Sequence, residues 1–259
     1  MICETDCQMS HVITIVSGKG GVGKTTSAVN LGAAMKKFGK DVVVLDANLT
    51  TPNVGLHLGA PIVPTSLNQV LSGKASIHEA IYEHESGMKI VPSSLSVKEL
   101  KRLNEGKLKH VAKQLRKMSD IVLYDAAAGL GDEAMAAVEA ADEVVLVTNP
   151  EIPAVTDALK ASKVIEDMGK PIKGLVVTRV RNNKTEMPVK NIQDMLELPL
   201  LGVIPEDHRV QAALVEKDAV MHTHPNAKVS RAYRKLAAKM IGKEDYKEEV
   251  GLLSRLFGW

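Results

Sequence analysis

The sequence predicts an α/β fold in which a mostly parallel sheet of about seven strands is doubly wound, with helices on both faces. Short runs rich in β-branched residues recur along the chain without alternation of polar and apolar side chains, which is typical of strands buried on both faces. Longer amphipathic stretches separate these runs, as crossover helices do in parallel sheets. The predicted strands are Val12–Ser17, Val42–Asp46, Met88–Val91, Ile121–Asp125, Val144–Thr148, Ile172–Thr178 and Leu200–Ile204.

The segments between these strands are expected to form the covering helices. They are longer than the strands and carry apolar residues at helical spacing. The predicted helices are Lys24–Phe38, Val97–Met118, Asp132–Ala141, Val155–Met168, Val189–Leu196, Val210–Lys217 and Lys228–Ile241.

The pattern of strands and helices continues to residue 242 without a linker rich in Pro, Gly or Ser. We therefore expect one domain over residues 1–242. A charged hinge, Lys243–Glu249, follows. The apolar segment after it lies beyond all of the predicted strands, so it is not required to complete the sheet. Residues 243–259 are accordingly predicted to form a hinge and a separate terminal helix.

The composition is that of an ordinary globular protein. Of 259 residues 45% are hydrophobic and 25% charged, and the net charge of +2 comes from 33 Lys+Arg against 31 Asp+Glu. These values exclude a disordered or collagen-like chain. No apolar run approaches the roughly 18–20 residues that span a bilayer, and Met1–Ser10 lacks the pattern of a signal peptide, so we expect a cytoplasmic protein.

A glycine-rich segment directly after the first predicted strand fits the pattern G-x-x-x-x-G-K-[ST]. Glycines let successive backbone N–H groups and the start of the next helix face a polyanion. The lysine of such a loop reaches the β- and γ-phosphates, and the following hydroxyl binds Mg²⁺. The residues of this predicted phosphate loop are Gly18, Lys19, Gly20, Gly21, Val22, Gly23, Lys24, Thr25 and Thr26.

The same glycines also fit a dinucleotide-binding fingerprint, since Gly18-x-Gly20-x-x-Gly23 is followed by Asp46 at the distance expected of a ribose-binding acid. Lys24 and Thr25 decide between the two interpretations. A nicotinamide or flavin site needs neither a cation nor a hydroxyl there, whereas a nucleoside triphosphate with Mg²⁺ uses both. The sequence therefore predicts binding of a nucleoside triphosphate.

The run from Lys19 to Thr25 resembles the deviant Walker A motif of the MinD/ParA family of ATPases. Further stretches follow in that family's order, and the resemblance covers essentially the whole chain and is closest to the MinD branch. Residues 42–46, 48 and 52–56 resemble switch I, residues 125–130 switch II and residues 148–151 a MinD-type loop. The segments similar to the family's adenine-binding residues are Thr178, Arg179, Pro205, Glu206 and Asp207.

The resemblance implies an ATPase that converts ATP and water to ADP and phosphate with Mg²⁺ as cofactor. Lys24 would bind the phosphates, and Lys19 would reach across an ATP-dependent homodimer to the phosphates on the other side. Thr25, Asp46 and Asp125 would hold Mg²⁺ with its water shell, although helix-cap or turn roles also suit the two acids. The catalytic residues implied are Lys19, Lys24, Asn48 and Asp125.

Asn48 departs from the family pattern, which has Asp at this position of switch I to position the attacking water. An asparagine orients water through its amide oxygen but accepts no proton. Because positioning matters more than deprotonation in phosphoryl transfer, we expect slow turnover rather than none.

The end of the chain predicts a short amphipathic helix. The protein has only two Phe, four Tyr and one Trp, and Phe257 and Trp259 lie within its last three residues. The resemblance implies that this segment lies in the membrane interface, weakly as one copy and tightly as two in an ATP-bound dimer. A peripheral location on the inner face of the cell membrane follows, with Leu252, Leu253, Leu256, Phe257 and Trp259 as the membrane-facing residues.

The most specific function that the sequence supports is thus a membrane-binding ATPase that positions an unidentified protein partner in division-site selection. Two alternatives stay open. A DNA or cargo partitioning ATPase would use the basic residues Lys98, Lys101, Arg102, Lys107, Lys109, Lys113, Arg116 and Lys117, together with Arg231, Arg234, Lys235 and Lys239.

The second alternative is an iron–sulfur carrier ATPase, which depends on Cys3 and Cys7 alone. Other metal chemistry has little sequence support. The histidines show no ligand spacing apart from His222 and His224, and we predict no metal site in the short loop Met221–Pro225.

Overall fold

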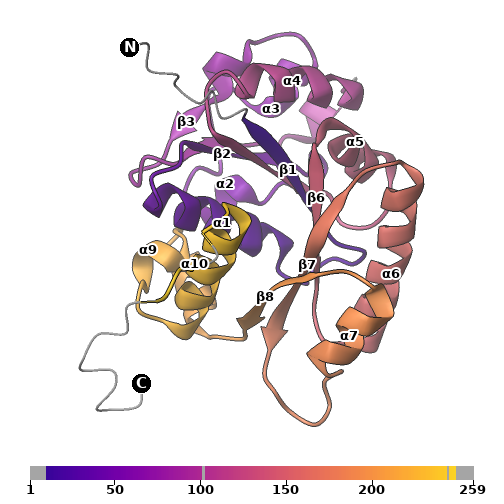
Figure 1. Cartoon of the computed structure of the whole chain (residues 1–259). Helices are drawn as coiled ribbons and strands as arrows, with labels where there is room; N and C mark the ends of the chain where they lie inside the picture. The colour runs from indigo at the N-terminus through magenta and orange to yellow at the C-terminus, as the bar shows by residue number, and fades with distance from the viewer. Residues whose placement is uncertain (1–9, 101–102, 244, 249–259) are drawn as a thin grey trace, which may run out of the picture.

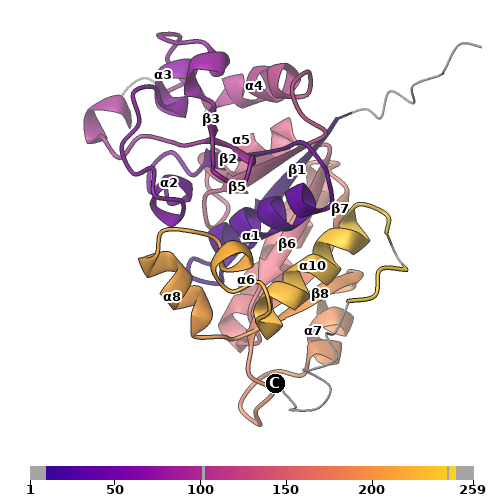
Figure 2. The ribbon, with the colours of Figure 1, turned by 90° about the vertical axis from the view of Figure 1, so that its left-hand side faces the viewer.

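The computed structural model describes residues 10–100, 103–243 and 245–248, and within them it contains one eight-stranded sheet covered by helices on both faces (Figures 1 and 2). All seven predicted strands are confirmed within a few residues at each end. The strands are β1 (His11–Val16), β2 (Val42–Ala47), β3 (Tyr82–Glu83), β4 (Lys89–Val91), β5 (Ile121–Ala126), β6 (Glu143–Thr148), β7 (Ile172–Val180) and β8 (Leu200–Pro205).

The strand order is β3-β4-β2-β5-β1-β6-β7-β8. Every neighbouring pair is parallel except β3 and β4, which form the short antiparallel hairpin that the sequence analysis did not predict. The first strand, β1, lies inside the sheet, and later strands lie on either side of it. The sheet is therefore doubly wound, and the carboxyl ends of the central strands β1, β2 and β5 lie at one edge.

Helices cover both faces of this sheet. In Figure 2 the helix α1 lies in front of the strands, with α10 beside it, and α6 and α7 lie behind them. The helices are α1 (Lys24–Lys37), α2 (Val54–His57), α3 (Leu67–Leu71), α4 (Leu108–Leu115), α5 (Asp132–Ala140), α6 (Ile152–Asp167), α7 (Val189–Leu196), α8 (Arg209–Val215), α9 (Val220–Thr223) and α10 (Lys228–Met240).

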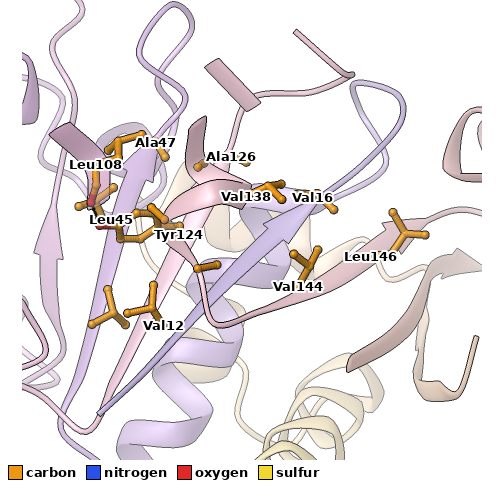
Figure 3. Close-up of a cluster of buried hydrophobic side chains, with 14 of the residues drawn as sticks. Val12, Val16, Leu45, Ala47, Leu108, Tyr124, Ala126, Val138, Val144 and Leu146 are labelled. Carbon is orange, nitrogen blue, oxygen red and sulfur yellow. Dashed lines mark hydrogen bonds between the residues drawn. The ribbon is translucent and has the colours of Figure 1, made fainter. Parts of the chain in front are cut away.

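The core consists of two apolar layers, one on each face of the sheet. Successive residues of a strand point to opposite faces, so Val12 and Val16 of β1 contribute to one layer and Ile13 and Ile15 to the other. Figure 3 shows part of the first layer, in which Val, Leu and Ala side chains surround the ring of Tyr124. That ring is fully buried, and its hydroxyl donates to the Leu108 carbonyl oxygen. Aliphatic side chains thus fill most of the interior, which agrees with the low aromatic content.

The predicted helix Val97–Met118 is wrong in its first half. The structure has 3₁₀ segments at residues 97–100 and 105–107 before α4 begins at Leu108. Asn104 has an extended backbone (φ −113°, ψ 90°), so the helical repeat cannot run through it. Of the basic residues in the predicted helix, Lys98 lies in the first 3₁₀ segment, Lys107 in the second and Lys109 and Lys113 on α4, whereas Lys101 and Arg102 lie outside the described residues.

The described part of the predicted hinge packs against the domain. Lys243 Nζ lies 5.1 Å from the centre of the Phe38 ring, and the Tyr246 ring contacts the same ring edge-on at 5.0 Å. The Glu248 carboxylate binds the Arg234 guanidinium through Nε at 2.8 Å and through Nη2, and both side chains are only 8% exposed. Residues 243 and 245–248 are therefore held on α1 and α10.

The predicted membrane helix, with Leu252 to Trp259, lies outside the described residues, as do Cys3 and Cys7. In the part of the chain that the structure describes, no helix has the length and apolar character needed to cross a bilayer.

Candidate functional site

The loop from Gly18 to Gly23 connects β1 to α1 at the carboxyl edge of the sheet. Gly23 has a left-handed backbone (φ 88°), which turns the chain into the first turn of α1. At Gly18 the loop approaches α6 so closely that an added Cβ would lie 2.2 Å from the Asp157 carbonyl oxygen. Only glycine allows this approach, which fixes the position of the loop against the helix.

A cation and a hydroxyl from the start of α1 converge on one buried carboxylate. Lys24 Nζ donates to Asp125 Oδ1 at 2.8 Å, and Thr25 Oγ1 donates to Asp125 Oδ2 at 2.6 Å. Asp125 is fully buried near the end of β5 and the Lys24 side chain is 8% exposed, so water screens the pair only weakly. The structure thus brings together three of the predicted site residues.

Asp46 lies beside Asp125, because the two residues are paired in the register of β2 and β5. Its carboxylate accepts backbone N–H groups from Asn48 at 3.1 Å, Asn53 at 2.8 Å and Val54 at 2.9 Å. Burial, and then the negative charge of Asp125, raise the pKa of Asp46 to about 8, although these three hydrogen bonds oppose the rise. Asp46 therefore holds the loop after β2 in place, although burial and the charge of Asp125 disfavour its ionised form.

This set of donors fits a magnesium ion. Mg²⁺ prefers hard oxygen ligands and keeps several of its waters, and Thr25, Asp46 and Asp125 offer a hydroxyl and two carboxylates in one place. A divalent cation there would also offset the repulsion between the two acids. With nucleotide and metal bound, Lys24 would bind phosphate oxygens and Thr25 would bind the metal. Each would do so in place of its hydrogen bond to Asp125.

The residues predicted to contact adenine lie against the side of the phosphate loop that faces away from Asp46 and Asp125. Thr178 Oγ1 donates to the Val22 carbonyl oxygen and is 3.1 Å from that of Thr148. Arg179 has a left-handed backbone (φ 55°), and its Nη1 donates to the Gly21 carbonyl oxygen at 3.1 Å.

The second predicted adenine segment, residues 205–207, joins this group through Glu206. The Glu206 backbone N–H donates to the Val180 carbonyl oxygen at 3.0 Å, and its carboxylate binds Arg179 and Arg181. Asp207 Oδ1 accepts the Arg209 backbone N–H at 3.0 Å, and Pro205 ends β8. The five residues therefore lie together at one end of the phosphate loop.

The two remaining predicted catalytic residues, Lys19 and Asn48, do not hydrogen-bond to Asp125. Lys19 is exposed on the phosphate loop, and its ammonium group makes no hydrogen bond or ion pair with any described residue. Asn48 is buried, and among the described residues its side chain hydrogen-bonds only to Thr51, through Oδ1 at 3.0 Å to the hydroxyl and through Nδ2 at 2.6 Å to the carbonyl oxygen. In this state Asn48 organises its own loop and does not contact Lys24 or Asp125.

Two contacts that the sequence analysis missed lie beside the predicted switch segments and the phosphate loop. Glu133, in the first turn of α5, accepts the Thr50 backbone N–H at 3.0 Å and its hydroxyl at 2.8 Å. The Gly129 backbone N–H donates to the Ser17 carbonyl oxygen at 2.9 Å. An acid in a first helical turn is usually explained by the helix dipole, so the sequence carried no signal for the contact of Glu133.

Known proteins are similar to this chain in sequence and in fold. The family model described as the CobQ/CobB/MinD/ParA nucleotide binding domain matches residues 13–220. An uncharacterised ATP-binding protein of Methanocaldococcus jannaschii is 41% identical over 234 residues, which cover 90% of this chain and 89% of the relative.

Two solved structures are also similar to this chain in fold and in sequence. The septum site-determining protein MinD of Pyrococcus horikoshii, in complex with Mg-ADP, superposes with a TM-score of 0.87 at 35% identity and covers 93% of this chain and 100% of its own. A chain of the MinC:MinD cell division protein complex of Aquifex aeolicus superposes with a TM-score of 0.83 at 26% identity, and the match covers 93% of the present chain and 100% of that chain.

Proposed function

The chain belongs to the CobQ/CobB/MinD/ParA nucleotide-binding family and is a MinD-type ATPase with ATP and Mg²⁺ as cofactors, and we propose that it is a nucleotide-controlled membrane switch. In the ATP-bound state it dimerises, binds the inner face of the cell membrane and positions a protein partner in division-site selection. ATP hydrolysis returns it to the monomer.

The convergence of Lys24, Thr25, Asp46 and Asp125 carries this proposal. Lys24 binds the β- and γ-phosphates, Thr25 and the two acids hold Mg²⁺ with its waters, and the N–H groups of residues 18–26 surround the phosphates. Thr178, Arg179 and residues 205–207 receive the adenine, since they lie at one end of that loop. Gly129 then releases Ser17 and turns its N–H toward the γ-phosphate.

Lys19 is assigned to the dimer. An exposed cation on the phosphate loop, with no partner among the described residues, is free to meet the phosphates of a second copy. Light scattering coupled to size-exclusion chromatography tests this assignment. We expect the wild type to dimerise with a non-hydrolysable ATP analogue but not with ADP, and Lys19→Ala to stay monomeric. The exposed Lys74→Ala should behave as the wild type, and a dimer of Lys19→Ala would contradict the role of Lys19.

Asn48 is assigned to positioning of the attacking water, with slow turnover as the consequence. Its amide must first leave Thr51, to which both of its ends are bonded, when ATP binds. Single-turnover hydrolysis of radiolabelled ATP tests this role. We expect Asn48→Asp to accelerate hydrolysis and Asn48→Ala to slow it, whereas an unchanged rate in both variants would place water positioning elsewhere.

Membrane binding is assigned to residues 243–259, beyond the ATPase domain of residues 1–242. The last described residues pack beside a hollow of about 900 Å³ between β8 and α10, which carries several lysines and one arginine. A positive surface next to an amphipathic segment favours anionic lipids, at about 1 kcal/mol for each cation near the surface. The basic residues that line this hollow are Lys228, Arg231, Lys235, Lys239 and Lys243.

Sedimentation with liposomes that contain anionic lipid tests this assignment. We expect binding with ATP to exceed binding with ADP, and deletion of residues 252–259 to abolish both. Replacement of Lys235 by Ala should weaken binding at low salt only, because exposed charges are screened by salt. Equal binding with the two nucleotides, or binding that survives the deletion, would refute the membrane switch.

A partitioning ATPase that binds DNA is the second candidate, because the same basic hollow suits a phosphate backbone. Arg234, one of the residues considered for this role, is buried and paired with Glu248, so it does not belong to the basic surface. ATP-dependent and strongly salt-dependent DNA binding without liposome binding would favour this candidate over the membrane switch.

A further inference from the structure

A cluster of two histidines and one aspartate lies apart from the nucleotide site. His84 belongs to the turn between β3 and β4, Asp218 to the connection between α8 and α9, and His222 to α9. His222 Nδ1 lies 2.7 Å from Asp218 Oδ1, and His84 Nε2 lies 3.4 Å from the same oxygen. Each side chain offers a ligand atom, and these atoms all lie within 4.8 Å of one another.

The spacing of these atoms is close to that of a metal site. With bonds of about 2.0–2.1 Å to nitrogen and oxygen, neighbouring ligand atoms in a tetrahedral zinc site lie about 3.3 Å apart. The distance of 3.4 Å from His84 to Asp218 matches this spacing, and that of 2.7 Å from His222 would have to open by about 0.6 Å. The two imidazole nitrogens lie within 4.8 Å of each other, so side-chain rotation has to bring them to the same spacing. The two imidazole rings are stacked at 5.3 Å with an angle of 15° between their planes, so neither blocks the other.

Neighbouring groups position the side chains of His84 and Asp218 and the helix that carries His222. Ser86 lies against the other nitrogen of His84 and orients the ring, with its hydroxyl 3.0 Å from Nδ1 and its backbone N–H donating to Nδ1 at 3.2 Å. With a cation at Nε2 the ring proton would be on Nδ1 and would be donated to the Ser86 hydroxyl, as metal-binding histidines donate to their outer partners. Asp218 Oδ1 also accepts the Ala219 backbone N–H at 2.6 Å. The helix α9 packs against α1, where Asn30 Oδ1 accepts the Met221 N–H at 3.1 Å.

The three side chains are half-buried, at 13% exposed for His84, 27% for Asp218 and 23% for His222. A cation would therefore be partly shielded, yet water still reaches the cluster and leaves room for a further ligand. Two imidazoles with one carboxylate favour Zn²⁺ and its neighbours Co²⁺ and Ni²⁺, whereas Mg²⁺ and Ca²⁺ prefer oxygen donors alone. The chemistry of the cluster thus differs from that of the Mg²⁺ site at Asp46 and Asp125.

We propose that His84, Asp218 and His222 form a binding site for a zinc-type divalent cation that joins the β3–β4 turn to α9. When the cation binds at His84 Nε2 and His222 Nδ1, each ring proton moves to the other nitrogen of its imidazole, and bonds to the cation take the place of the two hydrogen bonds to Asp218. It cross-links segments that are distant in sequence and thereby fixes α9 and the turn relative to each other. The sequence analysis predicted no metal site in Met221–Pro225, because it considered His222 with His224 only, and this proposal departs from that prediction. His224 Nδ1 pairs with the Thr223 hydroxyl at 2.9 Å and takes no part.

Titration with Co²⁺ tests the proposal, because tetrahedral Co²⁺ with nitrogen and oxygen ligands absorbs visible light. The protein used is the full chain with Cys3→Ser and Cys7→Ser, so that thiols contribute no cobalt site, in excess Mg-ADP to fill the nucleotide site. We expect one Co²⁺ to bind and Zn²⁺ to displace it. The variants His84→Ala and His222→Ala should each lose more than about 100-fold in affinity, since even outer partners contribute 10–100-fold.

His110→Ala is the matched control, because His110 is an exposed histidine on α4 away from the cluster. It should bind Co²⁺ as the parent does. Thermal unfolding gives a second readout, in which Zn²⁺ raises the melting temperature of the parent and of His110→Ala but not of His222→Ala. Retained Mg-ADP binding in each variant confirms that it is folded.

Equal Co²⁺ absorption in the parent, His84→Ala and His222→Ala would overturn the proposal, as would binding of Co²⁺ to none of them. In that case the cluster is a hydrogen-bonded His–Asp–His contact only. The result is independent of the proposed membrane switch, which is measured by nucleotide-dependent sedimentation.

Discussion

Lys24 Nζ lies 2.8 Å from Asp125 Oδ1, so the lysine that would bind the phosphates is paired with an acid that would hold the metal. Both groups are buried, and neither has a second charged partner within hydrogen-bonding distance among the described residues. Nucleotide and Mg²⁺ would therefore replace an existing ion pair rather than fill a site of unpaired charges. This exchange keeps both groups neutralised in the free and the bound states.

Replacement of Lys24 by Ala should abolish most of the nucleotide-dependent activity. The variant loses the cation at the phosphates and leaves Asp125 without its charged partner. The loss of one such contact to a developing charge commonly lowers the rate by about 10²–10³-fold. We expect ATP hydrolysis to fall by about that factor, as measured by phosphate release at saturating ATP. Lys74→Ala is the control, and near-normal hydrolysis by Lys24→Ala would show that another cation performs this role.

Two glycine substitutions in the phosphate loop should have different costs. At Gly18 an added Cβ would lie 2.2 Å from the Asp157 carbonyl oxygen, whereas at Gly21, with φ of 78°, no atom lies within 4 Å. Gly18→Ala must displace the loop from α6 and should destabilise the protein by about 3 kcal/mol. Gly21→Ala only strains a left-handed backbone and should cost about 1 kcal/mol. Chemical denaturation measures both, and equal costs would mean that the loop does not depend on α6.

The ion pair of Arg234 and Glu248 should make the end of the described chain sensitive to acid. Burial acts to raise the pKa of Glu248, but hydrogen bonds from Arg234 and Tyr246 outweigh it, so this pKa lies below its ordinary value of 4.5. A carboxylate of this kind stabilises the folded state above its unfolded pKa, and this contribution is lost as the pH falls through the folded pKa.

We therefore expect Glu248→Gln to lower stability by about 1–2 kcal/mol at pH 7, because glutamine keeps a hydrogen bond to Arg234 but not the charge. The difference from the wild type should shrink toward zero as the pH falls below 4.5, the ordinary pKa of Glu248. Thermal unfolding at several pH values measures it. Glu166→Gln, at an exposed pair with Lys163, should change stability by less than about 0.5 kcal/mol at any pH. A constant difference for Glu248→Gln across the acid range would contradict a charged pair.

The contact between Thr50 and Glu133 predicts that the loop after β2 depends on α5. Both the N–H and the hydroxyl of Thr50 bind the Glu133 carboxylate. Glu133→Ala should therefore speed amide hydrogen exchange of the segment around Thr50 by about five- to tenfold, which corresponds to loss of one hydrogen bond of about 1 kcal/mol. Glu139→Ala, at the other end of α5, should leave exchange there unchanged. If Glu133→Ala had no effect, the loop would be held by Asp46 and Asn48 alone.

Much of the fold followed from residue patterns. The seven parallel strands were predictable because buried strands consist of unbroken β-branched and aliphatic runs, and most helix ends agree to within a few residues. The helix predicted over Val97–Met118 failed because one residue, Asn104, has an extended backbone, which amphipathic periodicity does not reveal. The two-residue strand β3 was missed since so short a run has no periodicity to detect.

The sequence by itself determined the phosphate loop and the two acids at the ends of β2 and β5, because these depend on local order: strand, glycine-rich turn, lysine and helix. Only the tertiary structure decided which of these side chains meet. In the folded chain Lys24 and Thr25 bind Asp125, and Asn48 binds Thr51. Glu133 binds Thr50, and His84, Asp218 and His222 meet from three separate segments. Such contacts depend on strand register and helix packing across the whole sheet, and no short window of sequence contains that information.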